Sequence, residues 1–432
     1  MRLPGRLAAA IEVLAAIDAR HRPASEALKD WGNANRFAGA GDRAAIGNLV
    51  YDALRRRASH AWAMGSDAPR ALVLSVAVRD WGEDPAGFAG AFEGDRFAPA
   101  APNAEEMARL TLADPLGDAP DWVRGDVPEW TLPALKQAFG DDWLAECRAM
   151  TGRPPLDLRV NTLKSSRAKV LKSLQRFAPE ETPISPVGLG IPAGPRDART
   201  PNVLTDEGYL KGWFEVQDQG SQVAALLAGA RAGEQVLDLC AGAGGKTLAM
   251  AATMENKGQL FAHDLDRNRL APIYERLKRN GARNVQVRPP NPGALDDLAG
   301  RMDRVVIDAP CTGSGTWRRR PDAKWKLTPE QLATRLGEQA AILAEGARYL
   351  RPGGVLVYIT CSIFPEENDQ QVAALLAGQP GLELADARTA WSAALGEGVP
   401  LPRFTAGGGM ALSPQATGTD GFYVSLIRKA AT

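Results

Sequence analysis

The stretch VLDLCAGAGGKTLAM, residues 236–250, decides the fold class, because an apolar run leads into a glycine loop and then into a helical pattern. Glycine lets the backbone turn tightly and lets a ligand approach the amide groups at the start of the following helix. Two common nucleotide motifs do not fit, because a P-loop requires glycine where Cys240 stands and a dinucleotide fingerprint requires glycine where Thr247 stands. The stretch therefore predicts a strand, a ligand-binding loop and a helix, without identifying the ligand.

Strand and helix candidates alternate from residue 222 onward. The strand candidates are short apolar runs at Gln235–Leu239, Gln259–Ala262, Val285–Arg288, Asp303–Ile307 and Gly354–Ile359. Helical stretches separate them. This order predicts an α/β fold with a doubly wound, mostly parallel sheet that binds its ligand at the carboxyl ends of the strands.

Aspartates stand at the carboxyl ends of two of these strands. Asp264 follows the second strand about twenty residues after the glycine loop, where a carboxylate can bind ribose hydroxyls. Asp308 ends the fourth strand and faces the same crevice. Each aspartate alone could be a helix cap or a surface charge. Their combination with the glycine loop favours a nucleotide-like cofactor.

Two cysteines each follow a strand of the predicted sheet. Cys311 lies in DAPCTGSG after the fourth strand, and Cys361 lies in YITCS after the fifth. Both positions open onto one crevice, and a thiolate is a standard nucleophile for attack on an electron-poor ring carbon. The alternatives are two buried small side chains or a regulatory disulfide. The placement of both cysteines in turns at the functional edge favours a chemical role.

Basic residues are concentrated in two other segments. In Trp317–Lys326, WRRRPDAKWK, cationic and indole side chains are interleaved, which suits phosphate binding and base stacking; a solvated charge run is the alternative. A strand pattern at residues 156–161 opens the second segment, whose basic residues are Arg153, Arg159, Lys164, Arg167, Lys169, Lys172 and Arg176. This charge asymmetry is typical of a surface that binds a nucleic-acid backbone.

Composition narrows the function classes of the 432-residue chain. Lysine plus arginine and aspartate plus glutamate both number 51, so nucleic-acid affinity must come from local patches. Four scattered cysteines and three histidines argue against a disulfide scaffold or a structural zinc site. No apolar run is long enough to span a bilayer, and Glu12 and Asp18 interrupt the N-terminal apolar stretch, which indicates an amphipathic helix rather than a signal peptide. We expect a cytoplasmic protein.

The sequence resembles the RsmB–Nop–Sun family of S-adenosylmethionine-dependent RNA cytosine-5 methyltransferases. Motifs that match the family follow its order from about residue 130 to the end: RVNTLK (Arg159–Lys164), QDQGSQ (Gln217–Gln222), LDLCAGAGGKT (Leu237–Thr247), DAPCTGSG (Asp308–Gly315), RRRPDAKW (Arg318–Trp325), LRPGG (Leu350–Gly354), TCSIFPEEND (Thr360–Asp369) and TDGFYVSLIRK (Thr419–Lys429). The combination of DAPC with TCS is highly specific. The N-terminal helices, with DRAAIGNLVYDALRRR, resemble the NusB-like RNA-binding domain of bacterial members that modify 16S rRNA.

This resemblance implies three domains. They are a NusB-like helical RNA-binding domain at residues 1–115, linker helices with a small α+β RNA-recognition domain at 116–215, and a Rossmann-like methyltransferase domain at 216–432. The implied activity is methylation of C5 of cytosine in RNA, with rRNA favoured over tRNA, by a monomer that needs neither metal nor membrane. The alternatives are a tRNA cytosine-5 methyltransferase or a non-catalytic RNA-binding or assembly protein on the same fold.

The resemblance also implies roles for individual residues. Cys361 would attack C6 of the cytosine, Asp308 would hydrogen-bond N3, and Cys311 would help remove the C5 proton and release Cys361. The site for S-adenosyl-L-methionine would comprise the glycine loop and two aspartates: Cys240, Ala241, Gly242, Ala243, Gly244, Gly245, Lys246, Asp264 and Asp308. Lys246 would contact either the cofactor or RNA phosphate. One position departs from the family, because Asn291 stands where an aspartate near the adenine is usual.

Overall fold

The computed structural model describes residues 1–20 and 22–431, which form two compact units. One unit is helical and comprises Met1–Pro154, Ala193–Pro201 and Trp317–Leu327. The other unit contains both sheets and comprises Pro155–Pro192, Asn202–Thr316 and Thr328–Thr432. Three separate segments of the chain therefore contribute to each unit.

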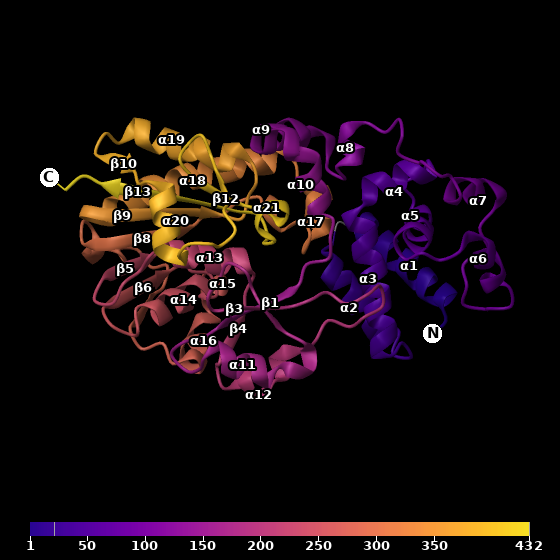
Figure 1. Cartoon of the computed structure of the whole chain (residues 1–432), viewed down its shortest axis with the longest axis horizontal. Coiled ribbons are helices and arrows are strands. Elements are labelled where there is room, and N and C mark those ends of the chain that lie inside the picture. The colour runs from indigo at the N-terminus through magenta and orange to yellow at the C-terminus, as the bar shows by residue number, and fades with distance from the viewer. Residues whose placement is uncertain (21, 432) are drawn as a thin grey trace. The chain divides into compact units, whose positions relative to one another are not determined.

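The helical unit is built mainly from the N-terminal helices, drawn in indigo and purple in Figure 1. Its helices are α1 (Leu3–Arg20), α2 (Ala24–Ala34), α3 (Ala40–Arg55), α4 (Arg57–Met64), α5 (Pro69–Ser75), α6 (Pro85–Phe92), α7 (Ala104–Leu110), α8 (Asp121–Arg124), α9 (Leu132–Phe139), α10 (Trp143–Ala149) and α17 (Pro321–Lys326), with a π-helical turn at Val76–Asp80. Leu7 and Leu14 of α1 are fully buried and share one apolar core with Ile46 and Leu49 of α3. The expected amphipathic N-terminal helix is thus present.

Helix α17 joins the helical unit from the middle of the chain, and Figure 1 shows it in orange beside α3. Lys324 Nζ donates hydrogen bonds to the carbonyl oxygens of Arg55 at 2.8 Å and Asp126 at 2.6 Å. The Lys324 side chain is buried, and this burial lowers its pKa to about 8. The segment at residues 317–327 is therefore fastened to this unit by buried hydrogen bonds.

A small antiparallel sheet opens the second unit. Its strands are β1 (Leu156–Val160), β2 (Glu180–Glu181), β3 (Gly188–Ile191) and β4 (Phe214–Val216), in the order β2-β3-β1-β4, with helices α11 (Arg167–Ser173) and α12 (Glu207–Leu210). Leu158 and Val160, the apolar positions of the predicted alternation, are buried together with Val170 and Phe214. The predicted strand is confirmed, because alternate side chains of a strand point to the same face.

The large sheet has nine strands. In chain order they are β5 (Gln235–Asp238), β6 (Gln259–His263), β7 (Val285–Arg288), β8 (Met302–Asp308), β9 (Leu350–Thr360), β10 (Leu382–Leu384), β11 (Arg403–Phe404), β12 (Met410–Leu412) and β13 (Phe422–Lys429). The spatial order is β11-β12-β13-β9-β8-β5-β6-β7, and β10 pairs with β13. Strands β5 to β9 are parallel, whereas β13 runs antiparallel to β9. The predicted doubly wound α/β sheet is confirmed.

Helices cover both faces of this sheet. They are α13 (Gln219–Leu227), α14 (Gly245–Thr253), α15 (Arg267–Leu270), α16 (Ile273–Asn280), α18 (Pro329–Tyr349), α19 (Asp369–Gly378), α20 (Ala387–Leu395) and α21 (Pro414–Thr417). Side chains of α13, α14, α16 and α20 share one apolar core, and those of α18 and α19 share the other. Two covered faces explain why the central strands are apolar throughout. Over the described residues, we find no helix with the length and apolar character that crossing a membrane requires.

Candidate active site

The glycine loop connects β5 to α14 with two residues in the left-handed region. Gly242 has φ +50° and Gly244 has φ +85°. A Cβ atom on Gly244 would lie 2.6 Å from Ile273 Cγ1, so close packing excludes any side chain there. A Cβ atom on Gly242 would make only ordinary van der Waals contacts, with Arg269 Nη2 at 3.6 Å and Asp264 Oδ2 at 3.9 Å. No side chain caps α14, so the amide groups of its first turn remain available to a ligand.

Asp264 lies directly after β6 and holds the glycine loop in place. Its Oδ2 accepts a hydrogen bond from Gly242 N at 2.9 Å, and its Oδ1 accepts one from Asp266 N at 2.8 Å. The carboxylate is buried. The structure therefore brings Asp264 to the loop, as its place after the second predicted strand indicates.

Asp238 is a site residue that sequence reasoning missed. It ends β5, where its Oδ2 accepts a hydrogen bond from Thr247 Oγ1 at 2.6 Å. Its Oδ1 is buried and has no hydrogen-bond partner among the described residues. Burial raises the pKa of this carboxyl to about 7. The available signal was an acidic residue within an otherwise apolar strand, LDLC.

Lys246 is directed at Asp308. The Lys246 Nζ lies 2.7 Å from Asp308 Oδ2, and the lysine is 7% exposed whereas the aspartate is 35% exposed. The Lys246 ammonium also lies 5.3 Å from the centre of the Phe422 ring. A buried cation beside a half-exposed carboxylate gives the edge of the crevice a donor and an acceptor in fixed positions.

The two cysteines are brought together at the ends of adjacent parallel strands. The Sγ atoms of Cys311 and Cys361 lie 3.4 Å apart. Their loops are joined by a hydrogen bond of 2.9 Å from Gly315 N to the Cys361 carbonyl. The hydrogen bond with Cys361, together with burial, raises the pKa of the Cys311 thiol well above its usual range. The raised pKa keeps the Cys311 thiol protonated at neutral pH, and either sulfur can be the donor of the hydrogen bond between them.

Glu367 joins the two cysteine loops and was also missed from the sequence. Its Oε1 accepts hydrogen bonds from Thr312 N at 2.8 Å and Gln339 Nε2 at 2.9 Å. Its Oε2 accepts from Thr312 Oγ1 at 2.5 Å and from Ser362 Oγ. The carboxylate has no solvent exposure. Thr312 follows Cys311 and Ser362 follows Cys361, so one buried carboxylate fixes both loops.

The remaining loop residues lie beside these groups. Cys240 follows β5, and burial raises the pKa of its thiol well above its usual range. Ala241 N donates to the His263 carbonyl at 2.8 Å, which joins the loop to the end of β6. Ala243 accepts a hydrogen bond of 2.7 Å from Arg276 Nη1. Asn291 accepts one of 3.1 Å from Arg267 Nη2 and is exposed.

The prediction that Trp317–Lys326 presents cations and indoles to RNA is wrong for its main members. Trp317 and Arg318 are buried, and Lys324 is buried with its ammonium on backbone carbonyls. Trp325 Nε1 donates to the Leu54 carbonyl at 2.6 Å. The Lys324 ammonium and the Trp325 indole N–H are thus satisfied by backbone carbonyls of the helical unit, because buried donors need internal partners.

The basic stretch between Arg153 and Arg176 is not a continuous surface either. Arg159 is buried, with its Nε donating to Gln217 Oε1 at 2.6 Å, and burial lowers its pKa to about 10. Lys164 Nζ donates to the Arg279 carbonyl at 2.6 Å. Part of the stretch therefore stabilises the fold instead of facing a nucleic acid.

Fold and site together define a doubly wound domain of the methyltransferase type. The family model described as 16S rRNA methyltransferase RsmB/F matches residues 225–428, and the RsmF/B-like ferredoxin-like domain matches residues 127–194. The chain belongs to the RsmB/F family of 16S rRNA methyltransferases.

Curated relatives and a solved structure agree with this assignment. Ribosomal RNA small subunit methyltransferase B of Klebsiella pneumoniae is 38% identical over 264 residues, which cover 60% of this chain but only 59% of that protein. The probable ribosomal RNA small subunit methyltransferase B of Synechocystis is 31% identical over 308 residues, or 70% of this chain and 67% of that protein. The crystal structure of PH0851 covers 99% of both chains with a TM-score of 0.73 at 24% identity, so it is similar in fold.

Proposed function

We propose that this chain transfers a methyl group from S-adenosyl-L-methionine to C5 of a cytosine in RNA, with 16S rRNA as the favoured substrate. The observation that carries the proposal is the pair of cysteine sulfurs 3.4 Å apart at the ends of β8 and β9. The family model and the names of the Klebsiella and Synechocystis relatives support ribosomal RNA over transfer RNA.

The residues around the glycine loop fit the cofactor. The unpartnered Oδ1 of Asp238 is suited to the ammonium group of its methionine part, because a buried carboxylate oxygen requires a donor. Asp264, at the end of β6, is placed to accept hydrogen bonds from ribose hydroxyls. The absence of side chains at Gly242, Gly244 and Gly245 lets the ligand approach the backbone from Cys240 to Gly245. When bound, the cofactor supplies an electrophilic methyl group on a sulfonium.

Cys361 is the nucleophile in this proposal. Its thiolate forms a bond to C6 of a cytosine displaced from its stack, and the electron pair of the C5–C6 double bond moves to C5. Asp308 hydrogen-bonds the base at N3, and Lys246 Nζ, 2.7 Å from Asp308 Oδ2, supplies the proton that this contact shares. The nucleophilic carbon C5 then accepts the methyl group.

Cys311 completes the reaction. The C5 proton must leave, and the electrons of that C–H bond re-form the double bond while the Cys361 sulfur departs from C6. Interaction with Cys361 is the largest cause of the raised pKa of Cys311. Cys311 first releases its own thiol proton to solvent, then accepts the C5 proton as a thiolate and so returns to its protonated form. This sequence gives the two thiols different roles despite their similar positions.

The proposal includes a monomeric enzyme, because a single copy of the chain carries every group that the reaction needs, and a cytoplasmic one, because its proposed substrate is ribosomal RNA. The test incubates purified protein and methyl-labelled cofactor with 16S rRNA, tRNA or DNA of the same sequence, followed by bisulfite mapping. We expect label at a single cytosine of 16S rRNA and none with Cys361→Ala. Label confined to tRNA would favour the tRNA alternative, and RNA binding without any label would favour the non-catalytic one.

A further inference from the structure

A cavity lined by charged side chains lies within the helical unit, and no step of the proposed methyl transfer uses it. Its volume is about 340 Å³, and it is lined by Asp52, Arg56, Arg79, Asp80, Trp81, Thr151, Gly152, Arg153, Gly194 and Arg196. Four guanidinium groups and two carboxylates therefore line one cavity. The cavity therefore has an excess of positive charge. Two neighbouring residues form ion pairs with its lining, Arg55 with Asp52 and Glu83 with Arg196, and their opposite charges leave this excess unchanged.

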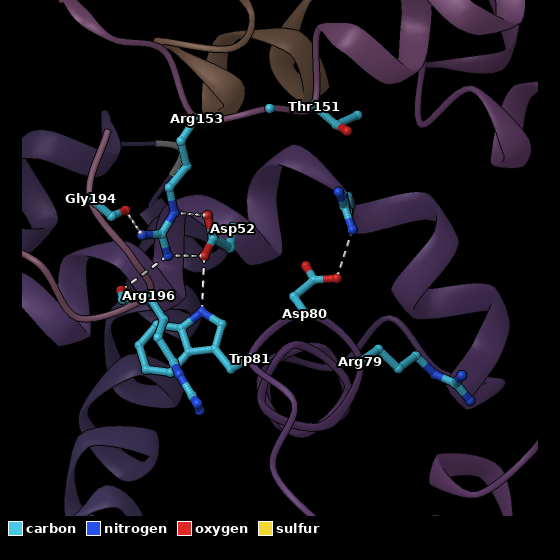
Figure 2. A pocket seen from close by; sticks show the side chains of 10 residues that line it. Asp52, Arg79, Asp80, Trp81, Thr151, Arg153, Gly194 and Arg196 are labelled. Atoms are coloured by element: carbon cyan, nitrogen blue, oxygen red, sulfur yellow. Dashed lines mark hydrogen bonds and ion pairs between the residues drawn. The ribbon is translucent and has the colours of Figure 1, made fainter. Parts of the chain in front are cut away.

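Asp52 has no accepting capacity left for a ligand. Arg55 Nη1 and Arg153 Nε each donate to Oδ1 at 3.0 Å, while Trp81 Nε1 at 3.0 Å and Arg153 Nη2 donate to Oδ2. Figure 2 shows Arg153 and Trp81 both directed at this carboxylate. A carboxylate offers about four acceptor positions, and here all of them are filled.

Asp80 has one partner on each carboxylate oxygen. Its Oδ1 accepts a hydrogen bond from Arg56 Nη1 at 2.8 Å, and its Oδ2 lies 3.2 Å from His60 Nε2. Asp80 therefore holds Arg56 and His60 in place, although unlike Asp52 it keeps some accepting capacity.

Arg56 and Arg196 are the exposed arginines of the cavity, and both have unused guanidinium donors, whereas the unpaired Nε of Arg79 is buried. Arg56 is 46% exposed and Arg196 is 47% exposed, and each uses only Nη1, for Asp80 and Glu83 respectively. Their other guanidinium N–H groups make no hydrogen bond within the part of the chain that the structure describes. Arg79, in contrast, extends away from Asp52 and donates to the Arg109 carbonyl at 2.8 Å.

Arg196 is held at the cavity by its backbone. Asn48 Nδ2 donates to the Arg196 carbonyl at 2.8 Å, and Arg153 Nη2 donates to the same oxygen at 3.1 Å. The loop Ala193–Pro201 is thereby fixed to α3, where Asp52 lies. A half-exposed arginine on an anchored backbone loses little conformational freedom when its side chain binds a ligand.

We propose that this cavity binds a phosphodiester of the RNA substrate through Arg56 and Arg196. Guanidinium groups pair with phosphate oxygens through two parallel hydrogen bonds, and four guanidinium groups outnumber the two carboxylates of the cavity. The inference rests on the proposed function for its choice of RNA over a free phosphate compound. It assigns a phosphate contact to exposed arginines of the helical unit, whereas Arg159 and Lys324 are buried.

The test measures the affinity of the full-length protein for labelled 16S rRNA over a series of salt concentrations. Arg196→Gln, Arg56→Gln and the double variant are compared with Arg36→Gln, which removes the same charge from an exposed arginine of the same unit. We expect weaker binding and a salt slope smaller by about 1 for each cavity arginine, with the Arg36 variant unchanged. If Arg56→Gln unfolds, Arg196→Gln still tests the inference, because among the described residues its side chain has only Glu83 as a partner to lose.

Three outcomes would overturn the inference. An equal loss of affinity in the Arg36 variant would show that net charge alone matters. Calorimetric binding of inorganic phosphate that both cavity variants abolish, with RNA affinity unchanged, would assign the cavity to a free phosphate compound. Methyl transfer by the wild type is measured in parallel. If the wild type transfers methyl groups and the variants bind RNA as tightly as the wild type does, only this inference is rejected. If the cavity variants bind RNA more weakly but the wild type transfers no methyl group, only the proposed function is rejected.

Discussion

The Cys311 and Cys361 sulfur atoms lie 3.4 Å apart although 50 positions separate the residues in the sequence. Parallel pairing of β8 with β9 sets Asp308 beside Ile359, so the loops that follow the two strands begin at the same edge of the sheet. At this distance the two thiols are linked electrostatically, and only one of them can ionise readily. The chemistry of the site depends on which one it is.

The carboxylate of Glu367 should control the geometry of both thiols. Glu367→Ala removes the acceptor for Thr312 N, Gln339 Nε2 and two hydroxyl groups, so we expect the turnover number to fall on the order of 100-fold. The turnover number of Glu367→Gln should fall less, because the hydroxyl groups of Thr312 and Ser362 can rotate to accept hydrogen bonds from the new amide. Single-turnover rates measure the effect, with the exposed Glu383→Gln as control. Equal rates in wild type and Glu367→Ala would show that Glu367 does not position the two thiols.

Asp264→Ala should weaken cofactor binding. Charge-assisted hydrogen bonds to ribose hydroxyls contribute about 1.5–3 kcal/mol each, and the Gly242 amide also loses its acceptor. Calorimetry with the demethylated cofactor measures the loss. Asp266→Ala is the matched control, because that neighbouring carboxylate caps α15 through Asn268 N and Arg269 N and is not directed at the loop. Identical affinities in the two variants would show that Asp264 does not contact the ligand.

Cofactor affinity should depend on pH through Asp238. Its pKa is raised to about 7, so the carboxyl is protonated below this pH and cannot pair with an ammonium group. We therefore expect affinity to fall about tenfold per unit as the pH drops below 7 and to level off above it. In Asp238→Asn the affinity should be lower and this pH dependence lost. Calorimetry between pH 5.5 and 8.5 is the measurement, and a wild-type profile that stays flat across pH 7 would contradict it.

Because of Lys324, the free energy of unfolding should increase as the pH rises above about 8. Burial lowers its folded-state pKa from 10.5 to about 8, so folding favours the neutral amine, and this contribution is lost as the pH falls through 8. Raising the pH from 7 to 10 should stabilise wild type relative to Lys324→Met by about 3 kcal/mol. Urea unfolding of both proteins at the two pH values gives the difference. A difference of zero would show that the amine titrates equally in the folded and unfolded states.

The sequence predicted those features that depend on local patterns. The five parallel strands, the glycine loop and the placement of Asp264 and Asp308 follow from periodicity and from the rule that ligands bind at strand ends. No comparable local pattern in the sequence predicts that β13 pairs antiparallel with β9, or that β10 pairs antiparallel with β13.

The remaining features depend on contacts between residues that are distant in the sequence, which no local pattern reveals. Lys324 and Trp325 have the composition of an RNA-binding segment, and only the carbonyls of Arg55, Asp126 and Leu54, distant in the sequence, show that they are buried donors. Glu367 looks like one acid in an acidic turn until its four hydrogen-bond donors are assembled around it. A charged residue in a sequence does not reveal whether its partner is water or protein.

The most direct test of the mechanism compares Cys361→Ser and Cys311→Ala with a cytosine-containing RNA and the cofactor on one denaturing gel. A serine hydroxyl is hardly ionised near neutral pH, so Cys361→Ser should neither turn over nor form a covalent complex. Cys311→Ala should still attack and methylate but should stall before release, so a protein–RNA complex that survives denaturation should accumulate. A trapped complex from Cys361→Ser, with none from Cys311→Ala, would contradict the assignment of Cys361 as the nucleophile.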